Sequence, residues 1–320
     1  DPFNLVSIAT LSVPENQISG FIVGDFNASD QDANTTLTYE LTGGAGDAGN
    51  DMFSLDANGT LHTKQAFNYE LNSSLNIRVR VKDEDNAFFD RNFTVIVTDL
   101  NDPPENLDAV SGLTVAENEP IGSIVGDFNA SDQDVNASLS YELAIGSGDA
   151  DNIFFTLDSN GTLRTATLFD FESNASTYSL LVRVRDEHNA SVEGNFSVNI
   201  LDVNENPFNL HSLAILSVPE NQSADSFVGE FNASDQDANT TLTYELASGT
   251  GYAANALFSL QPNGTLKSAV TFDYEANASL AIRVRVKDEH NASVEATFAV
   301  LVTDLNDPPE NLLEVSDLNF

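Results

Sequence analysis

Short runs of apolar residues recur along the chain and are separated by polar residues that favour turns. In the first hundred residues these runs cover 6–13, 21–28, 37–41, 52–55, 61–67, 75–81 and 93–98. Alternation of apolar and polar residues, with many Val, Ile and Phe, predicts β-strands, and Asn58-Gly59 predicts a tight hairpin. No ten-residue stretch carries a convincing helical period. The seven short strands predict an all-β Greek-key sandwich of the immunoglobulin-like type.

The whole pattern then repeats. The string Phe-Asn-Ala-Ser-Asp-Gln-Asp begins at Phe26, Phe128 and Phe231, so its copies are spaced by 102 and then 103 residues. A fixed period of this kind predicts tandem domains stacked end to end. We expect three repeats, at 1–102, 103–205 and 206–307, followed by the first strand of an incomplete fourth repeat at 308–320.

The composition narrows the possible partners. Acidic residues outnumber basic ones by 50 to 12, which gives a formal net charge of −38. Nucleic acid is excluded as a partner because no basic stripe exists to meet its phosphates, and bound cations or a saline setting are expected instead. No apolar run approaches membrane-spanning length, and no cysteine is present to form a disulfide. The chain begins at Asp1 without methionine, as expected for a piece of a longer protein.

Three acidic runs that contain proline follow apolar segments, at 99–106, 202–207 and 304–311. A single such run is most simply a solvated linker. Three runs at a fixed interval favour a site for a hard cation, because calcium takes six to eight oxygen ligands from carboxylates, amides and main-chain carbonyls.

Strand direction brings further acidic groups to these runs. If successive strands alternate in direction, Glu15, Asn68 and Glu70 lie at the linker end of repeat 1, and the Asp-x-Asp motifs and the aspartate after the sixth strand lie at the other end. Stacking then gathers seven carboxylates between repeats 1 and 2, from Glu15, Glu70, Asp99, Asp102, Asp132, Asp134 and Asp186. Such a group cannot stay together without cations, and several calcium ions are the expected remedy.

At these residues the chain resembles the cadherin family, in the divergent form common in large surface proteins. The resemblance covers all three repeats. It rests on Pro-Glu-Asn, Asp-x-Asp, the Asp-x-Glu motif, the aspartate after the sixth strand, and a linker of the form Asp-x-Asn-Asp/Glu-Asn-Pro. Departures from the pattern include Ala116 in place of a proline, Asn68 in place of the aspartate of the Asp-x-Glu motif, and Pro103 in place of the last asparagine of the first linker.

The resemblance implies about three calcium ions at each complete junction between repeats. The ligands implied for the first junction are Glu15, Asn68, Glu70, Asp99, Leu100, Asn101, Asp102, Asp132, Asp134 and Asp186. Those for the second are Glu117, Asp170, Glu172, Asp202, Val203, Asn204, Glu205, Asp235, Asp237 and Asp288. The incomplete ends hold Asp30, Asp32, Asp83, Glu220, Asp273, Glu275, Asp304, Asn306 and Asp307. Leu100 and Val203 would contribute main-chain oxygens.

The two junctions differ at one of these positions. Asn68 stands where Asp170 occupies the second junction, so the first has seven carboxylates and the second has eight. The charge of the ligands is a main determinant of calcium affinity. By resemblance, the position of Asn68 serves the ion farthest from the next repeat, which we therefore expect to be the weakest of the six. The alternative is that Asn68 coordinates through its oxygen with little loss.

Seventeen Asn-x-Ser/Thr sequons occur, against about six expected by chance. Copying of an accidental sequon by repetition is the alternative, but Asn27 is predicted to point outward between two inward residues. We expect glycosylation among Asn27, Asn34, Asn58, Asn72, Asn92, Asn129, Asn136, Asn160, Asn174, Asn189, Asn195, Asn221, Asn232, Asn239, Asn263, Asn277 and Asn291.

No motif for a nucleophile, a phosphate loop or a catalytic zinc site occurs, so catalysis is not expected. His188 and His290 follow candidate calcium ligands without a second His or Cys at ligand spacing, and we place them in solvent-exposed loops. The repeated carboxylates fit a structural cation better than acid–base chemistry.

The function predicted is a calcium-rigidified extracellular rod at the cell surface that acts in adhesion or as a structural element. Its partners would be other cadherin-like repeats of the same or neighbouring chains. One alternative is a self-assembling fibre subunit. We expect the tail 311–320 to be disordered, or to pair with a neighbouring chain if a fibre forms. A second is a carbohydrate-binding module for surface glycans, although the chain has no tryptophan and most of its phenylalanines are predicted to point inward.

Overall fold

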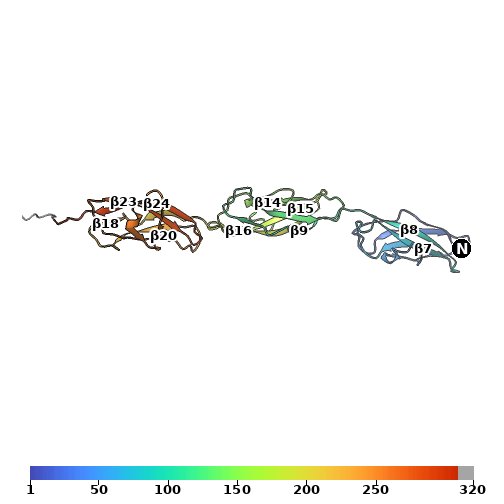
Figure 1. The fold of residues 1–320 in the computed structure, drawn as a ribbon. Coiled ribbons are helices and arrows are strands. Elements are labelled where there is room, and N and C mark those ends of the chain that lie inside the picture. The colour runs from blue at the N-terminus through green and yellow to red at the C-terminus, as the bar shows by residue number, and fades with distance from the viewer. Residues whose placement is uncertain (309–320) are drawn as a thin grey trace, which may run out of the picture. The chain divides into compact units, whose positions relative to one another are not determined.

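The computed structural model describes residues 1–308, whose regular secondary structure comprises β-strands, drawn as arrows in Figure 1, and three short 3-10 helices. Repeat 1 contains β1 (Phe3–Ser7), β2 (Ser12–Pro14), β3 (Ile22–Ser29), β4 (Thr38–Leu41), η1 (Asn50–Met52), β5 (Phe53–Leu55), β6 (Thr60–Thr63), β7 (Ser74–Lys82) and β8 (Phe88–Thr98).

The same order of elements returns twice. Repeat 2 contains β9 (Glu105–Ala109), β10 (Thr114–Ala116), β11 (Ile124–Ser131), β12 (Ser140–Leu143), η2 (Asn152–Phe154), β13 (Phe155–Leu157), β14 (Thr162–Thr165), β15 (Thr177–Arg185) and β16 (Ser191–Leu201). Repeat 3 contains β17 (Phe208–Ser212), β18 (Ser217–Pro219), β19 (Phe227–Ser234), β20 (Thr243–Leu246), η3 (Asn255–Leu257), β21 (Phe258–Leu260), β22 (Thr265–Ser268), β23 (Ser279–Lys287) and β24 (Ser293–Thr303).

Two sheets make up each sandwich. In repeat 1 their strand orders are β1-β3-β6-β5 and β2-β8-β7-β4, and repeat 3 has the same arrangement in β17-β19-β22-β21 and β18-β24-β23-β20. Repeat 2 contains the sheet β13-β14-β11-β9, and β15 pairs with β12 and β16. These pairs are antiparallel, whereas β2 and β18 run parallel to β8 and β24. The predicted all-β sandwich class is confirmed.

Alternate side chains of the strands fill the space between the sheets. On β7, Ile77, Val79 and Val81 are fully buried. Phe26 on β3 reaches across to β8, where its ring centroid lies 4.7 Å from that of Phe93. The counterparts of this pair are Phe128 with Phe196 and Phe231 with Phe298. The period-two pattern in the sequence therefore identifies the residues that form the core.

The observed strand limits differ from the predicted ones by more than one residue in three places. The run 6–13 is divided between β1, which pairs with β3 in one sheet, and β2, which lies beside β8 in the other. The predicted strand 61–67 ends at Thr63, because the chain then turns toward the end of the repeat. β8 begins at Phe88, five residues before the predicted start, because its first residues pair with the end of β7.

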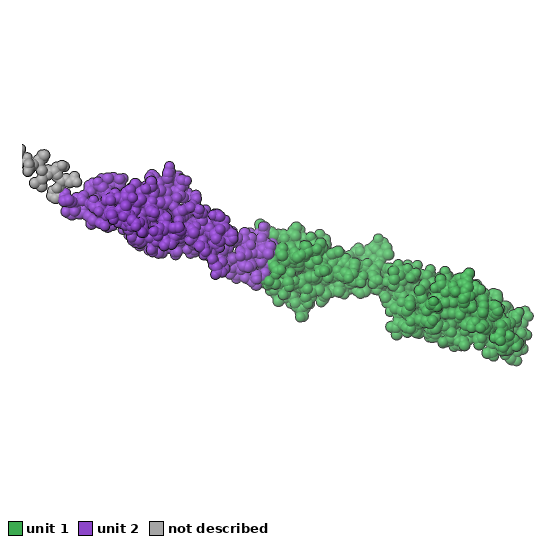
Figure 2. Space-filling model, turned by 60° about the horizontal axis from the view of Figure 1, so that its bottom comes forward, with its two compact units in different colours: residues 1–114, 120–167, 177–199 green, residues 115–119, 168–176, 200–320 purple. Residues whose placement is uncertain are grey.

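Two compact units can be distinguished in the chain (Figure 2). One comprises residues 1–114, 120–167 and 177–199, and therefore holds repeat 1, its linker and most of repeat 2. The other comprises residues 115–119, 168–176 and those from 200 onward, and holds repeat 3 with the adjoining end of repeat 2. The predicted fourth-repeat strand, 308–320, and the behaviour of its tail at 311–320 lie outside the described residues, apart from residue 308.

Candidate metal centre

One glutamate per repeat organises the acidic residues near the linker. Glu15 follows β2 and is fully buried. Its carboxylate accepts hydrogen bonds from the main-chain N–H of Tyr69 at 2.7 Å and of Leu100 at 2.8 Å. Glu15 therefore ties the turn after β6 to the beginning of the linker, two segments far apart in the sequence. A buried carboxylate held by two N–H donors is fixed in position.

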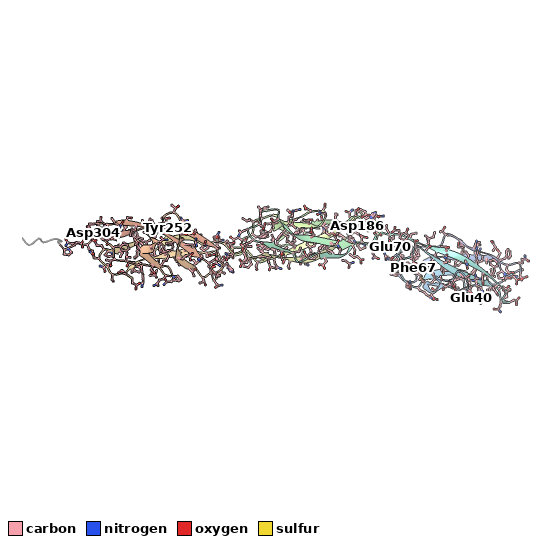
Figure 3. The ribbon with its side chains drawn as sticks, in the orientation of Figure 1. Glu40, Phe67, Glu70, Asp186, Tyr252 and Asp304 are labelled. Carbon is pink, nitrogen blue, oxygen red and sulfur yellow. The ribbon has the colours of Figure 1, made fainter. Side chains whose placement is uncertain are left out.

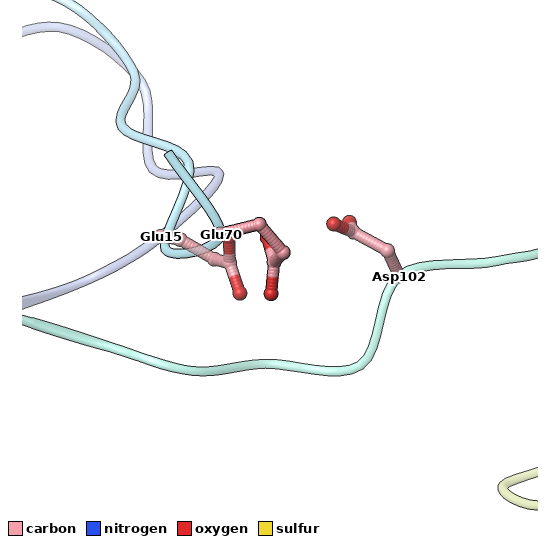
Figure 4. Close-up of side chains that lie close together, drawn as sticks. All are labelled: Glu15, Glu70 and Asp102. Carbon is pink, nitrogen blue, oxygen red and sulfur yellow. The ribbon is translucent and has the colours of Figure 1, made fainter. Parts of the chain in front are cut away.

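Glu70 and Asp102 face the same carboxylate. Oxygen atoms of Glu15, Glu70 and Asp102 lie within 4.8 Å of one another (Figure 4). A second group, Glu70 with Asp99 and Asp134, meets the same criterion and joins the linker to repeat 2. We call junction 1 the set formed by these five residues together with Asn68, Leu100, Asn101, Asp132 and Asp186. Figure 3 labels Glu70 and Asp186 within it.

The linker of junction 1 is also hydrogen-bonded to repeat 2. The main-chain N–H of Asp102 donates to Asp134 Oδ2 at 2.8 Å, and Asn101 Nδ2 donates to Asp186 Oδ2 at 2.8 Å. The other oxygen of Asp186 accepts from the main-chain N–H groups of His188 and Ala190. Repeat 2 thus presents its two acidic loops to the linker, as alternating strand direction predicts. A hollow of about 640 Å³ adjoins these groups and belongs to the same site.

We call junction 2 the set of ten residues predicted for the second linker; its anchoring glutamate repeats the construction of junction 1. Glu117 is 2% exposed and accepts from the N–H groups of Phe171 at 2.7 Å and Val203 at 2.9 Å. The N–H of Glu205 donates to Asp237 Oδ2 at 3.1 Å. The acidic groups within 4.8 Å here are Glu117 with Glu172 and Asp202, and Glu172 with Glu205 and Asp237. Asn204 donates to Asp288 at 2.9 Å, as Asn101 donates to Asp186.

Two further acidic sets lie in the first and third repeats, outside the two junctions. At the end of repeat 3, Glu220 accepts from the N–H groups of Tyr274 and Leu305, and it lies within 4.8 Å of Glu275 and Asp307. The remaining residues predicted at this end, Asp273, Asp304 and Asn306, lie in the same loops; Asp304 is labelled in Figure 3. At the start of repeat 1, Asp30 and Asp83 lie 3.6 and 3.9 Å from the amino group of Asp1, and Asp30 accepts from the N–H of Asp32.

Crowding of carboxylates changes their acidity. Burial, followed by repulsion from Glu15 among others, raises the pKa of Glu70. At junction 2, burial and the charges of Glu117, Asp237 and Glu172 raise the pKa of Glu205 to about 7. Both shifts oppose ionisation, so the metal-free junctions hold negative charge at a cost in free energy.

Asp186 shows the opposite shift. Its burial favours the neutral form, but the hydrogen bonds from Asn101 and from the N–H groups of Ala190 and His188 lower its pKa on balance. Asp288 in junction 2 is held in the same way by Asn204 and by the N–H groups of Ala292 and His290. These two aspartates are therefore kept ionised by the protein itself.

Several carboxylate oxygens in these sets are buried and accept no hydrogen bond. They are Glu70 Oε2, Asp102 Oδ2 and Asp132 Oδ2 in junction 1, Glu172 Oε2, Glu205 Oε2 and Asp235 Oδ2 in junction 2, and Asp30 Oδ2 at the first end. Buried polar atoms normally have partners because leaving them unpaired is costly. Carboxylate oxygens without donors are the ligands that calcium prefers, so the residues present fit this cation.

No role at the junctions was predicted from the sequence for the asparagine that follows each anchoring glutamate. Asn16 Nδ2 donates to Asp102 at 2.8 Å, Asn118 Nδ2 donates to Glu205 at 2.6 Å, and Asn221 Nδ2 donates to Asp307 at 2.7 Å. Each fixes the last acidic residue of the linker. The signal was present, since Glu-Asn occurs at the same place in all three repeats.

His188 and His290 are exposed beside the junctions, as predicted, and their main-chain N–H groups donate hydrogen bonds to Asp186 and Asp288.

Asp170 accepts hydrogen bonds from the N–H and the hydroxyl of Ser173 in its own turn. In the described part of the chain, no helix is long and apolar enough to cross a membrane.

The family model for the cadherin domain matches residues 9–99, 112–201 and 215–303. The chain belongs to the cadherin family. Cadherin domains bind calcium at the junctions between repeats, which is where the buried carboxylates gather in this chain. The segment is extracellular, as cadherin ectodomains are.

Among its relatives, the chain is 29% identical to human Protocadherin Fat 4 over 315 residues, which cover 94% of the chain and 6% of that protein. It is 35% identical to human Protocadherin-16 over 220 residues, which cover 66% of the chain and 6% of that protein. The cadherin segment therefore spans only a small part of these relatives, which are cadherins rather than enzymes.

Solved cadherin structures share the fold. The extracellular cadherin domains 1-5 of Protocadherin Gamma B2 superpose with a TM-score of 0.65 at 23% identity, covering 95% of this chain and 60% of theirs. The structure titled Protocadherin gammaB7 EC3-6 cis-dimer gives a TM-score of 0.63 at 26% identity and covers 95% of this chain and 75% of its own.

Proposed function

We propose that this segment is a calcium-rigidified rod of cadherin repeats that acts in adhesion or as a structural element outside the cell. The observation that carries the proposal is the set of buried carboxylate oxygens without hydrogen-bond donors at both junctions. A cation bound there would neutralise repulsion and tie the linker to both repeats. Neighbouring repeats would then keep a fixed orientation.

The ligands proposed are the junction residues predicted from the sequence. In junction 1, Glu15, Glu70 and Asp102 would hold the ion farthest from repeat 2. Asp99 and Asp134 would join Glu70 around the next ion, and Asp132 and Asp186 would belong to the third. About three ions per junction follow from family resemblance. The six to eight oxygen ligands that calcium takes can be supplied by these residues with water and main-chain carbonyls.

Calorimetric titration of the metal-free chain, followed by small-angle scattering and thermal unfolding, tests this proposal. We expect about six ions at the two complete junctions, a stiffer scattering envelope with calcium, and a higher melting temperature, because a ligand that binds only the folded state stabilises it. Magnesium serves as the control, since it demands near-octahedral geometry and keeps its waters. If removal of calcium leaves both the envelope and the melting temperature unchanged, the proposal is wrong.

A self-assembling fibre subunit remains a second proposal. It rests on the acidic sets Glu220, Glu275 and Asp307 in repeat 3 and Asp30 and Asp83 in repeat 1, to which a cadherin repeat of a neighbouring chain could contribute ligands. Sedimentation velocity over a range of calcium concentrations tests it. A calcium-dependent series of oligomers is expected from a fibre subunit, whereas a single monomeric species at all concentrations would contradict it.

Carbohydrate binding is the third function considered. Phe88 and Phe89 are exposed at 54% and 40%, and Arg80 lies over the ring of Phe88 at 4.0 Å. With Phe3, Phe208 and Phe227, these two residues are the exposed exceptions, among the described residues, to the prediction that most phenylalanines point inward. A glycan array probed with the parent chain and with Phe88→Ser tests this function. Equal glycan binding by the parent chain and by Phe88→Ser would show that Phe88 and Phe89 do not form a carbohydrate site.

A further inference from the structure

Asn68 occupies a position that is aspartate in the other two repeats. It lies in Phe67-Asn68-Tyr69-Glu70, whereas Asp170 and Asp273 occupy the equivalent places. An amide differs from a carboxylate in one respect that matters here: it carries N–H donors as well as an acceptor oxygen. The structure shows what Asn68 does with each end of its amide.

Both ends of the Asn68 amide have partners. Its Oδ1 accepts from the main-chain N–H of Leu71 at 2.7 Å, within its own turn. Its Nδ2 donates to Oε1 of Gln133 at 2.7 Å. Gln133 belongs to repeat 2, between the candidate calcium ligands Asp132 and Asp134. The hydrogen bond therefore joins repeat 1 to repeat 2 directly, side chain to side chain.

Junction 2 has the same glutamine but lacks this bond. Gln236 stands between Asp235 and Asp237, and Asp170 stands opposite the position of Asn68. Both oxygens of Asp170 accept from Ser173. Within residues 1–308, no hydrogen bond joins Asp170 to Gln236. The two junctions thus differ in one inter-repeat bond and one negative charge, and both differences originate from a single residue.

We propose that Asn68 and Gln133 form an amide bridge that holds repeats 1 and 2 together when the cations are removed, so that junction 1 is less dependent on calcium than junction 2. The inference rests on the proposed calcium function. A neutral hydrogen bond needs no cation and is insensitive to chelation. Junction 1 also holds seven carboxylates instead of eight, which reduces the repulsion that opens a metal-free junction.

The bridge and the missing charge make separate contributions, and different variants separate them. Gln133→Ala removes the bridge and leaves every carboxylate in place. Gln236→Ala makes the same change in the same loop of junction 2, where no bridge exists, and is the matched control. Asn68→Asp adds the eighth carboxylate, but an aspartate could still accept from the amide N–H of Gln133, so this variant tests the charge rather than the bridge.

The absence of cysteine allows each junction to be measured alone. Spin labels on cysteines introduced at Asn76 and Ser179 report on junction 1, and labels at Ser179 and Ala281 report on junction 2. All three positions are exposed on equivalent strands. Pulsed electron paramagnetic resonance gives the distribution of label distances for the full chain in calcium and in chelator.

In chelator, we expect a narrower distribution at junction 1 than at junction 2. Gln133→Ala should reduce the ratio of closed to open forms at junction 1 by about two- to tenfold, as expected for one hydrogen bond. Gln236→Ala should leave junction 2 unchanged. If Gln133→Ala broadens junction 1 no more than Gln236→Ala broadens junction 2, the bridge is refuted.

The calcium-loaded samples test the proposed function on its own. Narrow distributions at both junctions in calcium support it whether or not the bridge exists, and an unchanged distribution at both on adding calcium would refute it. Asn68→Asp should increase the calcium affinity of junction 1 severalfold, because it restores an anionic ligand. Gln133→Ala should leave the melting temperature in calcium unchanged, which excludes misfolding as the cause of any broadening.

Discussion

Replacing Glu15 with glutamine tests whether the buried carboxylates are calcium ligands or only structural acceptors. The change keeps the size of the side chain but removes its charge. Glutamine has one acceptor oxygen, so it can accept only one of the two N–H groups of Tyr69 and Leu100 that now bond to the carboxylate. Its NH2 group would face the other donor. This loss should destabilise the chain by about 1–3 kcal/mol with or without calcium.

The second effect of Glu15→Gln depends on calcium. In the metal-free chain, the charge of Glu15 lies within 4.8 Å of the oxygens of Glu70 and Asp102. Two unit charges at this distance repel by about 3 kcal/mol at an effective dielectric constant of about 20. We count only the pair formed with Glu70, which gives a lower bound for this repulsion. The variant relieves this repulsion in chelator, whereas a bound cation has already relieved it in calcium.

The stabilisation due to calcium is the difference between the free energies of unfolding in calcium and in chelator. The lost hydrogen bond lowers the free energy of unfolding equally in calcium and in chelator, so it cancels from this difference. The relieved repulsion appears only in chelator, so Glu15→Gln should reduce the calcium-dependent stabilisation by about 3 kcal/mol. Guanidinium unfolding of the full chain under the two conditions measures it. Asp108→Asn removes an exposed charge from β9 and is the control. Equal calcium-dependent stabilisation in the parent and Glu15→Gln would refute the reasoning.

Three further predictions concern single positions. Hydrogen bonds from Arg80 and Arg78 lower the pKa of Asp90. The stability that this ionised aspartate gives to the folded chain is therefore complete above the ordinary pKa of aspartate, and it is lost as the pH falls through the lowered value. Asp90→Asn should lower the free energy of unfolding by about 2 kcal/mol at neutral pH. Urea unfolding should show that the difference between the parent chain and this variant disappears in acid. Gly59→Ala should lower the melting temperature, because φ is +97° and the new Cβ would lie 2.9 Å from the carbonyl oxygen of Phe26. Mass spectrometry of the chain from a glycosylating host should find a glycan on Asn27, which is exposed on β3.

Each of these three predictions has a control residue elsewhere in the chain. Asp108→Asn should show no pH-dependent gap, and a persistent gap for Asp90→Asn in acid would contradict the ion-pair explanation. Gly112→Ala, where nothing lies within 4 Å of the new Cβ, should be tolerated. Asn221 donates to Asp307 at 2.7 Å, so its sequon should be less occupied than that of Asn27. Equal occupancy of the two would show that the folded structure does not limit modification.

The core and the positions of the acidic ends could be predicted because both follow from local pattern. Alternation in 75–81 identifies Ile77, Val79 and Val81 as buried, and the structure places them there. Counting strand directions was sufficient to bring Glu15 near Glu70. The division of 6–13 into β1 and β2 could not be predicted, because an alternating pattern shows which face is buried and not which sheet the strand joins.

Contacts between segments far apart in sequence were also beyond prediction. The bond from Asn16 to Asp102 spans 86 residues, and the bond from Asn68 to Gln133 spans 65. Each depends on a rotamer and on a loop conformation that neither local sequence specifies. The sequence identified Asn68 as a missing charge, and only the structure shows that its amide nitrogen donates a hydrogen bond to the next repeat.

The distribution of basic residues favours a cation site over a solvated acidic linker. Most of the twelve Lys and Arg residues lie on one strand per repeat, on β7, β15 and β23, facing away from the core. There they pair with carboxylates of the same sheet, as in Arg80 with Asp90, Arg185 with Glu142 and Arg285 with Glu245. In residues 1–308, no Lys or Arg forms an ion pair with an acidic residue of either junction. A linker that needed only solvation could accept such partners freely. Instead, carboxylates on the sheets are paired within the chain, whereas those at the junctions, most of them buried or half-buried, have no Lys or Arg partner in the described residues. This arrangement favours positive charge supplied from outside the chain, as the proposed calcium sites would provide it.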